Sequence, residues 1–303
     1  MTSSLHIGEE VSGALAAGLP VVALESTIFS GMGLPSPANR ECLERCDAAI
    51  RDGGAIPALT AVIGGIGVVG VEAGDIDRVL AGSAKVAARD LPFAVATSLD
   101  VGVTTVSATV TLAAAAGISV FATGGIGGVH RGSELTGDIS HDLLAMSRHP
   151  VATVSAGAKA FLDLPGTLEY LETMGVPVVG WNTDRFPAFY TRDSGVGVTA
   201  TVRTGADVAA MMTAAADLGH PGGVLVANPI PEAAELDPDR INAALDAALA
   251  EVAAKGLRGP AVTPLVLAAI ADATDGDSIP ANLALAENNA IVAAEIASAV
   301  AAG

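Results

Sequence analysis

Short apolar runs alternate with amphipathic segments along most of the chain. Residues 20–26, 118–123, 151–157 and 176–181 are mainly apolar and have the length of buried strands. Intervening segments such as 37–52 carry apolar and charged residues at helical spacing, which predicts helices that bury one face. This alternation predicts an α/β protein in which helices cover a largely buried sheet.

The remaining segments extend this pattern. Residues 73–92 predict a polar helical stretch, and residues 93–97 predict a strand that leads into an alanine-rich helix. Residues 181–195 predict an irregular loop whose aromatic side chains would form a lid. Beyond about residue 231 we expect three helices, the last covering residues 281–302.

A glycine pattern in residues 60–71 could be mistaken for a nucleotide-binding motif. Gly65, Gly67 and Gly70 match GxGxxG, but this motif requires a helix after it, and strand-like sequence follows instead. We therefore interpret the segment as a β-hairpin about a Gly-Gly turn. No dinucleotide cofactor is implied.

Composition limits the class of protein. The chain has 303 residues, 51% of them hydrophobic, and no linker is evident, which favours one domain over residues 1–303 with an extensive core. The formal charge is 15 − 33 = −18, which would repel nucleic acids and anionic membranes. A phosphorylated substrate would therefore need an enclosed pocket with a few cations and backbone amides.

No targeting or membrane segment is evident. The N-terminal residues lack a basic segment followed by an apolar one, and apolar runs are interrupted before the ~20 residues of a membrane span. We therefore expect a cytoplasmic protein with neither a membrane nor a nucleic-acid partner.

Candidate chemistry is concentrated in residues 117–164. A predicted strand, a glycine-rich loop, a helix over 138–148 and another strand follow one another, and Lys159 comes just after the second strand. Sites in α/β folds lie at strand carboxyl ends, and small apolar neighbours would partly desolvate the Lys159 amine, which favours a nucleophile. Glu25 ends another predicted strand and suits an acid–base role, although a solvated surface glutamate is an equal alternative.

Other polar residues have both a functional and a structural interpretation. Asp138 and Asp142 are four residues apart, so on one helical turn they could present oxygen ligands to manganese or magnesium, or Asp138 or Ser140 could cap the helix. Lys85 could simply form a surface ion pair on its helix. Asn282 and its neighbouring asparagines need partners in an apolar helix, either a nucleobase edge or other helices.

Nine segments, in matching order across nearly the whole chain, resemble the pseudouridine-5'-phosphate glycosidase family, which includes indigoidine synthase A-like proteins. They are ALESTIFSGMGLPSPAN, KVAARDLP, TTVSAT, FATGGIGGVHRG, DISHDL, VSAGAKAFLD, TLEYLETMGVPVVG, GGVLVANPIPE and ANLALAENNA.

The resemblance implies a three-layer α/β/α fold with a mixed sheet and a homotrimeric assembly. It also implies a lyase-type glycosidase that reversibly cleaves the carbon–carbon bond of pseudouridine 5'-phosphate, a phosphorylated C-nucleoside, to uracil and ribose 5-phosphate. Manganese is the implied metal, one ion per subunit, with magnesium or another divalent ion as an alternative. In the implied route the ribose ring opens, Lys159 forms an imine adduct, and hydrolysis releases the sugar.

Residue roles follow from the resemblance position by position. Glu25 corresponds to the proton donor, Lys159 to the covalent nucleophile and Asp142 to a further catalytic residue, while Asp138 corresponds to the metal ligand. The implied substrate contacts are Lys85, Val106, His130, Ser140, His141, Asp142 and Asn282.

Two departures from the family pattern leave other functions open. Residues 97–106 are one residue longer than the usual turn, which affects the wall at Val106, and His141 replaces a smaller residue between Ser140 and Asp142. A related enzyme that forms or cleaves another C-riboside is one alternative. A catalytically silent phosphosugar-binding protein is another, and it would bind ligand without turnover.

Overall fold

The computed structural model describes residues 4–257 and 262–303. At its centre lie five parallel strands, and these are mostly short runs of valine, alanine and leucine because both faces are covered. In spatial order they are β3 (Ile56–Ile63), β2 (Val21–Leu24), β7 (Val120–Ala122), β8 (Ala152–Ser155) and β11 (Leu225–Ala227).

Six further strands complete the sheet within the described residues. They are β9 (Val178–Trp181) and β10 (Ala200–Val202) beyond β11, β4 (Ile66–Val69) and β1 (Leu5–Ile7) beyond β3, and β6 (Val101–Thr104) and β5 (Lys85–Val86), which branch from β3. Both β4 and β6 pair with β3 in antiparallel orientation, so the sheet is mixed as predicted.

The predicted hairpin is confirmed. Ile63 of β3 pairs with Ile66 of β4, and the two residues between them, Gly64 and Gly65, have φ values of +58° and +76°. A two-residue turn with positive φ at both positions matches the twist of the strands it joins, and glycine adopts it without steric cost.

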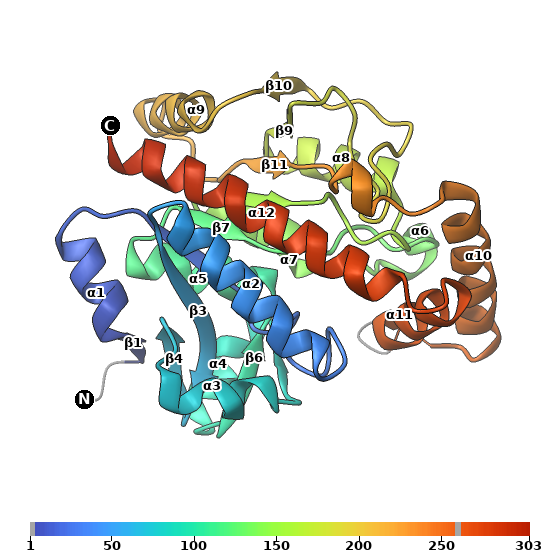
Figure 1. The fold of residues 1–303 in the computed structure, drawn as a ribbon, viewed down its shortest axis with the longest axis horizontal. Helices are drawn as coiled ribbons and strands as arrows, with labels where there is room; N and C mark the ends of the chain where they lie inside the picture. Colours follow the sequence, from blue (N-terminus) through green and yellow to red (C-terminus); the bar gives the residue numbers. More distant parts are fainter. Residues whose placement is uncertain (1–3, 258–261) are drawn as a thin grey trace.

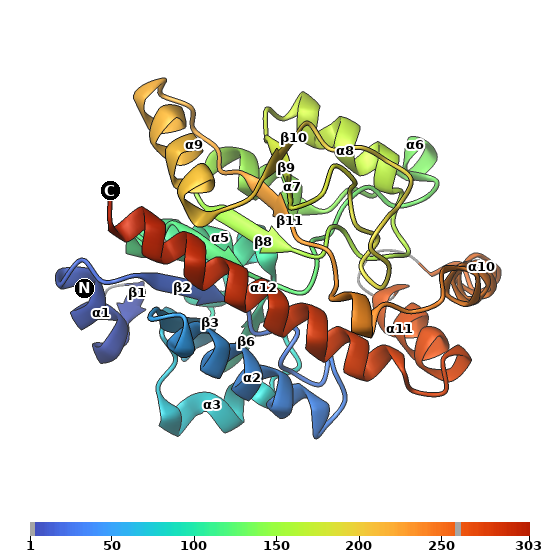
Figure 2. The same ribbon diagram turned by 45° about the horizontal axis from the view of Figure 1, so that its top comes forward.

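Helices cover both faces of the sheet (Figures 1 and 2). On one face α12 (Ser278–Ala301) crosses the strands between α2 (Ala38–Asp52) and α9 (Gly205–Asp217). On the other face lie α5 (Val106–Ala116) and α7 (His141–Arg148). The predicted three-layer α/β/α architecture is therefore confirmed.

Shorter elements connect these layers. They are α1 (Glu9–Ala16), α3 (Ala73–Leu80), α4 (Leu91–Ala96), α6 (Ser133–Thr136), α8 (Leu164–Thr173), α10 (Pro238–Ala254), α11 (Val262–Ala273) and 3₁₀ turns at Ala88–Asp90 and Glu232–Ala234. The C-terminal trio α10, α11 and α12 matches the three predicted helices.

Helix α12 bears on the expectation that apolar runs are interrupted before membrane-spanning length, and Glu287, Asn288 and Asn289 do interrupt it. Its 24 residues are long and apolar enough to cross a membrane by length and composition alone. In the structure, however, it packs against α2, α9 and the strands β2, β7 and β8, and its inward face is buried. Burial in the core accounts for its apolar composition.

Two predicted elements are wrong. Residues 93–97 lie mostly in α4 rather than a strand, because Pro92 occupies the first turn of a helix, where it is well tolerated. The helical stretch predicted over residues 73–92 ends at Leu80, and Lys85 lies on β5, where pairing with Val103 of β6 overrides local helical preference. Lys85 is therefore not a helix-surface residue.

Candidate active site

The carboxyl ends of the central parallel strands bring the candidate residues together. Glu25 follows β2, Thr123 follows β7, Asn228 follows β11, and Lys159 lies four residues beyond the end of β8. Because these strands run in the same direction, their carboxyl ends form one edge, the usual position of sites in such sheets.

Two cavities meet at this edge. A polar cavity of about 310 Å³ extends toward α7, and an apolar cavity of about 50 Å³ extends toward α11 and α12. Glu25, Thr27, Lys85, Lys159 and Phe161 line both. An acid candidate and an amine nucleophile candidate therefore share the junction of the two cavities.

Glu25 is buried in this junction, with 5% of its surface exposed. Burial raises the pKa of its carboxyl group, and the nearby charge of Asp142 adds to the rise. Lys159, Lys85 and a hydrogen bond from the Thr123 hydroxyl oppose that rise without cancelling it. A carboxyl group that keeps its proton above the usual pH is suited to act as a general acid.

Buried hydroxyl groups fix the backbone next to Glu25. Ser26 accepts a 2.8 Å hydrogen bond from the amide of Thr104, and Thr27 donates to the Thr104 carbonyl at 2.7 Å. The hydroxyls of Thr60 and Thr104 are 2.8 Å apart, and Thr60 also donates to the carbonyl of Leu24 at 3.0 Å. The segment after β2 is thus attached to β3 and β6.

The two lysines reach the cavities from different elements. The backbone of Lys159 is held by a 3.0 Å bond from its amide to the carbonyl of Ile126 in the glycine-rich loop. Lys85 extends from β5, where burial and the positive charge of Lys159 lower the pKa of its amine, while Glu25 and Asp142 oppose that lowering. The charges of Lys159 and Asp142 thus act on both Glu25 and Lys85.

The predicted placement of Asp138 and Asp142 on one helical turn is wrong. Helix α7 begins only at His141, so Asp138 lies before it, and Ser140 is the N-cap, accepting from the amide of Asp142 at 3.2 Å. The two Asp142 oxygens accept hydrogen bonds from backbone amides instead, Oδ1 from Ser107 and Oδ2 from Gly127, each at 2.9 Å. This buried carboxylate joins three segments around the polar cavity.

Asp138 and His130 lie together at the wall of the polar cavity. Nδ1 of His130 is 3.9 Å from Oδ2 of Asp138, and burial lowers the pKa of the imidazole. Within the described part of the chain, no three His, Cys, Asp or Glu side chains gather to form a complete metal site. The donor set fits an ion held by one carboxylate that takes its other ligands from water and substrate, a pattern typical of magnesium.

The other predicted substrate contacts also reach this region. Val106 is the buried first residue of α5, and with Ser140 and His141 it lines the polar cavity. The amide of Ser107 and the glycine-rich loop complete that wall. The structure thus brings the predicted contacts of residues 106 and 140–142 to one cavity.

Asn282 lies in the apolar cavity instead. Only 6% of its surface is exposed, and its Oδ1 atom has no hydrogen-bond partner among the residues described. By contrast, Asn289, two turns along α12, donates to the carbonyl of Thr123 at 2.8 Å and accepts from Asn228 at 2.9 Å. A buried amide oxygen without a protein partner is unusual, and since Asn282 lines the cavity, its predicted contact with a ligand stays a prediction.

Aromatic and aliphatic residues form the rest of the apolar cavity. Phe189 and Tyr190 come from the loop after β9, and their rings pack edge to face with centroids 4.8 Å apart. Burial raises the pKa of the Tyr190 hydroxyl, which also forms a hydrogen bond with Ser278. Two aromatic residues of the predicted loop therefore line the apolar cavity together with Ile270 of α11, and the lid stays a prediction.

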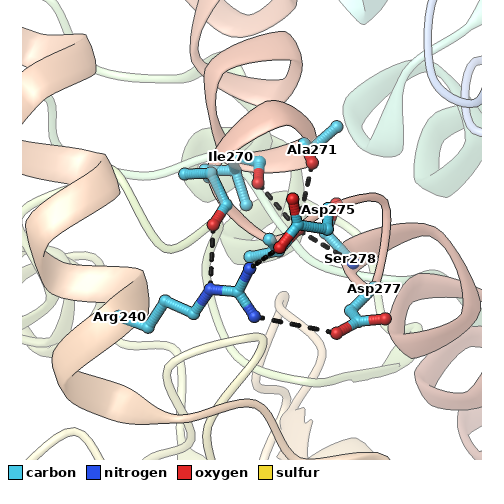
Figure 3. A network of polar contacts seen from close by, with 8 residues as sticks. Arg240, Ile270, Ala271, Asp275, Asp277 and Ser278 are labelled. Atoms are coloured by element: carbon cyan, nitrogen blue, oxygen red, sulfur yellow. Dashed lines mark hydrogen bonds and ion pairs between the residues drawn. The ribbon is translucent and has the colours of Figure 1, made fainter.

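A polar network fixes the turn that carries Ser278. Arg240 of α10 donates to the carbonyl of Ala273 at 2.8 Å and to Asp275 at 2.5 Å, and lies 3.8 Å from Asp277 (Figure 3). These contacts connect α10 to the α11–α12 turn, next to the Ile270 and Tyr190 wall of the apolar cavity.

Some of these residues were missed at the level of sequence. Thr123 and Ile270 are not among the predicted site residues, and Phe189 and Tyr190 are predicted only as part of an aromatic loop, although Thr123 ends a predicted strand at the same edge as Glu25. Strand-end position was the available signal for Thr123. No sequence signal identifies Ile270, because its helix packs there only in the tertiary fold.

Comparisons with known proteins place the chain in a family. A family model described as indigoidine synthase A like protein matches residues 10–299. The fold is shared with an indigoidine synthase A-like protein from Thermotoga maritima, at 33% identity and a TM-score of 0.87, over 99% of this chain and 98% of that one. The chain therefore belongs to the indigoidine synthase A-like family of α/β proteins.

Sequence relatives give the enzymatic name of this family. A pseudouridine-5'-phosphate glycosidase from Chloroflexus aurantiacus is 51% identical to this chain, over 97% of each of the two sequences. One from Hahella chejuensis is 50% identical, over 98% of each. The prealnumycin C-glycosynthase AlnA, whose structure contains ribulose 5-phosphate, is 40% identical with a TM-score of 0.90, over 98% of this chain and 97% of AlnA.

Proposed function

We propose that this protein reversibly cleaves the carbon–carbon glycosidic bond of pseudouridine 5'-phosphate, giving uracil and ribose 5-phosphate. The observation that carries the proposal is that Glu25 and Lys159 line both cavities at their junction. The relatives' shared name supports this substrate. The apolar cavity with Asn282 suits the uracil ring, and the polar cavity suits the sugar phosphate.

The proposed reaction begins at the ribose ring. Glu25 gives a proton to ring oxygen O4′ as the C1′–O4′ bond breaks. The N1 lone pair of uracil is conjugated with C1′ through C6 and C5, and it helps to expel O4′. The neutral Lys159 amine bonds to C1′ and returns a proton to Glu25. The intermediate is an open-chain sugar that carries both uracil and Lys159 on C1′.

Cleavage then uses the nitrogen lone pair of Lys159. Glu25 protonates C5 of uracil, the C1′–C5 electron pair goes to C5, and the Lys159 nitrogen forms an iminium with C1′. Water adds to the iminium, its extra proton returns to Glu25, and collapse frees the amine and the aldehyde of ribose 5-phosphate. One water is consumed, and no oxidant or reductant is needed.

Asp142 and Lys85 support this chemistry through charge and position. Since both Asp142 oxygens accept amide hydrogen bonds, its proposed role is to hold the cavity wall and balance the two lysines rather than to transfer protons. Lys85, with Ser140 and His141, would bind the sugar phosphate. His130 and Val106 would complete the wall on that side.

We also propose a manganese ion, or magnesium or another divalent ion in its place, held by Asp138. Its other ligands would be water and substrate oxygens, and when bound it would neutralise phosphate charge. Binding can be followed by the loss of the free Mn²⁺ electron paramagnetic resonance signal. Asp138→Asn is expected to weaken binding at least about tenfold, and unchanged binding would contradict the assignment.

A homotrimer in the cytoplasm is the proposed setting. The resemblance to the family carries this proposal, and exposed apolar side chains such as Phe93, Leu135 and Leu218 are candidates for subunit contacts. Light scattering coupled to size-exclusion chromatography would give the mass in solution. A mass of one 29.8 kDa chain would contradict the trimer.

The activity test uses purified, metal-stripped protein with pseudouridine 5'-phosphate, with and without Mn²⁺, and measures uracil by chromatography. Manganese-dependent release is expected, and Lys159→Ala should lower turnover by more than about 1000-fold. Full turnover by Lys159→Ala would contradict the mechanism. Lys255→Ala, which removes an exposed lysine paired with Glu251, is the matched control.

Imine formation can be tested directly. Borohydride reduction in the presence of ribose 5-phosphate should attach the sugar covalently to Lys159. The sequence contains three lysines, at positions 85, 159 and 255, so peptide mass spectrometry distinguishes them unambiguously. Label on Lys85 alone would move the nucleophile to that residue.

A second candidate function is C-ribosylation of another aglycone, supported by the similarity to AlnA and by His141 beside the site. Turnover of a non-uracil C-riboside 5'-phosphate, with negligible uracil release, would favour it. Ligand binding without any turnover would instead favour the silent phosphosugar-binding protein.

A further inference from the structure

Thr123 connects Glu25 to the buried side of the sheet. Its hydroxyl donates a hydrogen bond to Oε1 of Glu25, and both side chains line the apolar cavity. Thr123 and Glu25 are each only 5% exposed, so water does not compete effectively for this contact. The two residues are 98 positions apart, which makes the contact a product of the tertiary fold.

The backbone of Thr123 is itself fixed from two directions. Its amide donates to the carbonyl of Val154 at 3.0 Å, and its carbonyl accepts from Asn289 of α12 at 2.8 Å. Asn289 in turn accepts from Asn228, at the end of β11, at 2.9 Å. The backbone that carries the Thr123 hydroxyl is therefore held from both sides.

We propose that Thr123 is a positioning residue that holds the Glu25 carboxyl group toward the junction of the two cavities. The proposal rests on the proposed role of Glu25 as proton donor. A carboxyl group that must reach O4′, C5 and the Lys159 nitrogen in turn needs a fixed starting orientation, and misplacement by about 1 Å can cost 100-fold in rate.

The charges around Glu25 agree with this role. Lys159, Lys85 and Asp142 act on it electrostatically, and the hydrogen bond from Thr123 stabilises its ionised form against the effect of burial. His130, Asp138, His141, Arg89 and Asp90 line the same polar cavity. Loss of the Thr123 hydroxyl should therefore raise the pKa of Glu25 further while leaving those charges in place.

The experiment compares Thr123→Val, which keeps the shape and removes the hydroxyl, with Thr123→Ser, which keeps the hydroxyl. In Thr123→Val we expect kcat to fall about tenfold with KM within twofold, and the alkaline limb of the pH profile to move up by about one unit. Thr123→Ser should restore kcat to within about threefold of the parent enzyme.

Thr153→Val is the matched control. Thr153 lies on the adjacent strand, its hydroxyl is buried, and that hydroxyl has no partner among the residues described. Kinetics should be unchanged in this variant. Equal damage from Thr123→Ser and Thr123→Val, or an unmoved pH profile in Thr123→Val, would overturn the proposal.

A second readout separates this proposal from the proposed function. Carboxyl-carbon NMR titration of ¹³C-glutamate-labelled protein, with Glu25→Gln to assign the resonance, follows Glu25 without any turnover. Thr123→Val should shift its midpoint upward by about one pH unit. If uracil release fails but this shift occurs, the substrate assignment is wrong and the positioning role stands; if the midpoint is unmoved, the positioning role fails.

Discussion

The main-chain amide of Ser107 donates a 2.9 Å hydrogen bond to Oδ1 of Asp142, 35 residues away in the chain. The other oxygen accepts from Gly127 at the same distance. One carboxylate therefore joins the start of α5, the start of α7 and the glycine-rich loop. Both of its oxygens must be acceptors, which restricts this position to a carboxylate.

Asp142→Asn tests this restriction. The new amide nitrogen would face a backbone N–H donor, so one hydrogen bond to a charged acceptor is lost and a buried donor is left unpaired. We expect the free energy of unfolding to fall by about 2–3 kcal/mol, measured by urea denaturation. Asp217→Asn on the exposed surface of α9 is the control, and an equal small effect in both would contradict the interpretation.

The charge of Lys85 should be visible in the pH dependence of the reaction. The positive charge of Lys85 lowers the pKa of Glu25. Lys85→Met should therefore raise the pKa of Glu25, so that Glu25 stays protonated to higher pH. The alkaline limb of kcat/KM is expected to move to higher pH while its maximum falls through weaker phosphate binding. Lys255→Met removes a distant positive charge and should leave the limb in place; a shift of equal size there would exclude a local effect.

Two asparagines of α12 should have different roles: Asn282 is expected to contact the ligand, and Asn289 is expected to stabilise the fold. In Asn282→Leu, removal of a buried oxygen that lacks a protein partner should leave stability unchanged or raise it, while KM rises at least about tenfold. In Asn289→Leu, loss of the bonds to Thr123 and Asn228 should lower stability by about 2–4 kcal/mol. Thermal unfolding and kinetics on both variants check the contrast, and a larger stability loss in Asn282→Leu would reverse it.

The proximity of Glu25 and Lys159 could be predicted from sequence, because it follows from the position of each residue after a predicted strand. Each follows an apolar run, and parallel strands place their carboxyl ends on one edge. The Gly64-Gly65 turn was equally predictable, since its residues determine its backbone.

Features that depend on distant pairing could not be predicted in this way. The strand at Lys85 exists because β6 is beside it, and the helical pattern of neighbouring residues pointed elsewhere. The partners of Asp142 are amides 15 and 35 residues away, so its spacing from Asp138 carried no information about its role. Likewise, the Thr123 contact crosses 98 residues.

Gly127 lines the polar cavity and should not tolerate a side chain, for reasons of space rather than backbone conformation. A Cβ atom there would lie 2.3 Å from Oγ of Ser140 and 2.7 Å from Oδ2 of Asp142. Both residues would have to move, and the amide of Gly127 would lose its bond to Asp142.

Gly127→Ala is therefore expected to lower turnover by at least about 100-fold and stability by about 1–3 kcal/mol. Adding Ser140→Ala removes Oγ, the nearest atom, while Cβ of residue 140 stays 2.7 Å away, so the double variant should lose somewhat less than the sum of the single losses. Gly74→Ala on α3 is the control, because nothing lies within 4 Å of its Cβ position and a helical alanine should be neutral or stabilising. Strict additivity of the two site substitutions, measured in kcat/KM and in urea, would show that the Ser140 hydroxyl is not what excludes a side chain at Gly127.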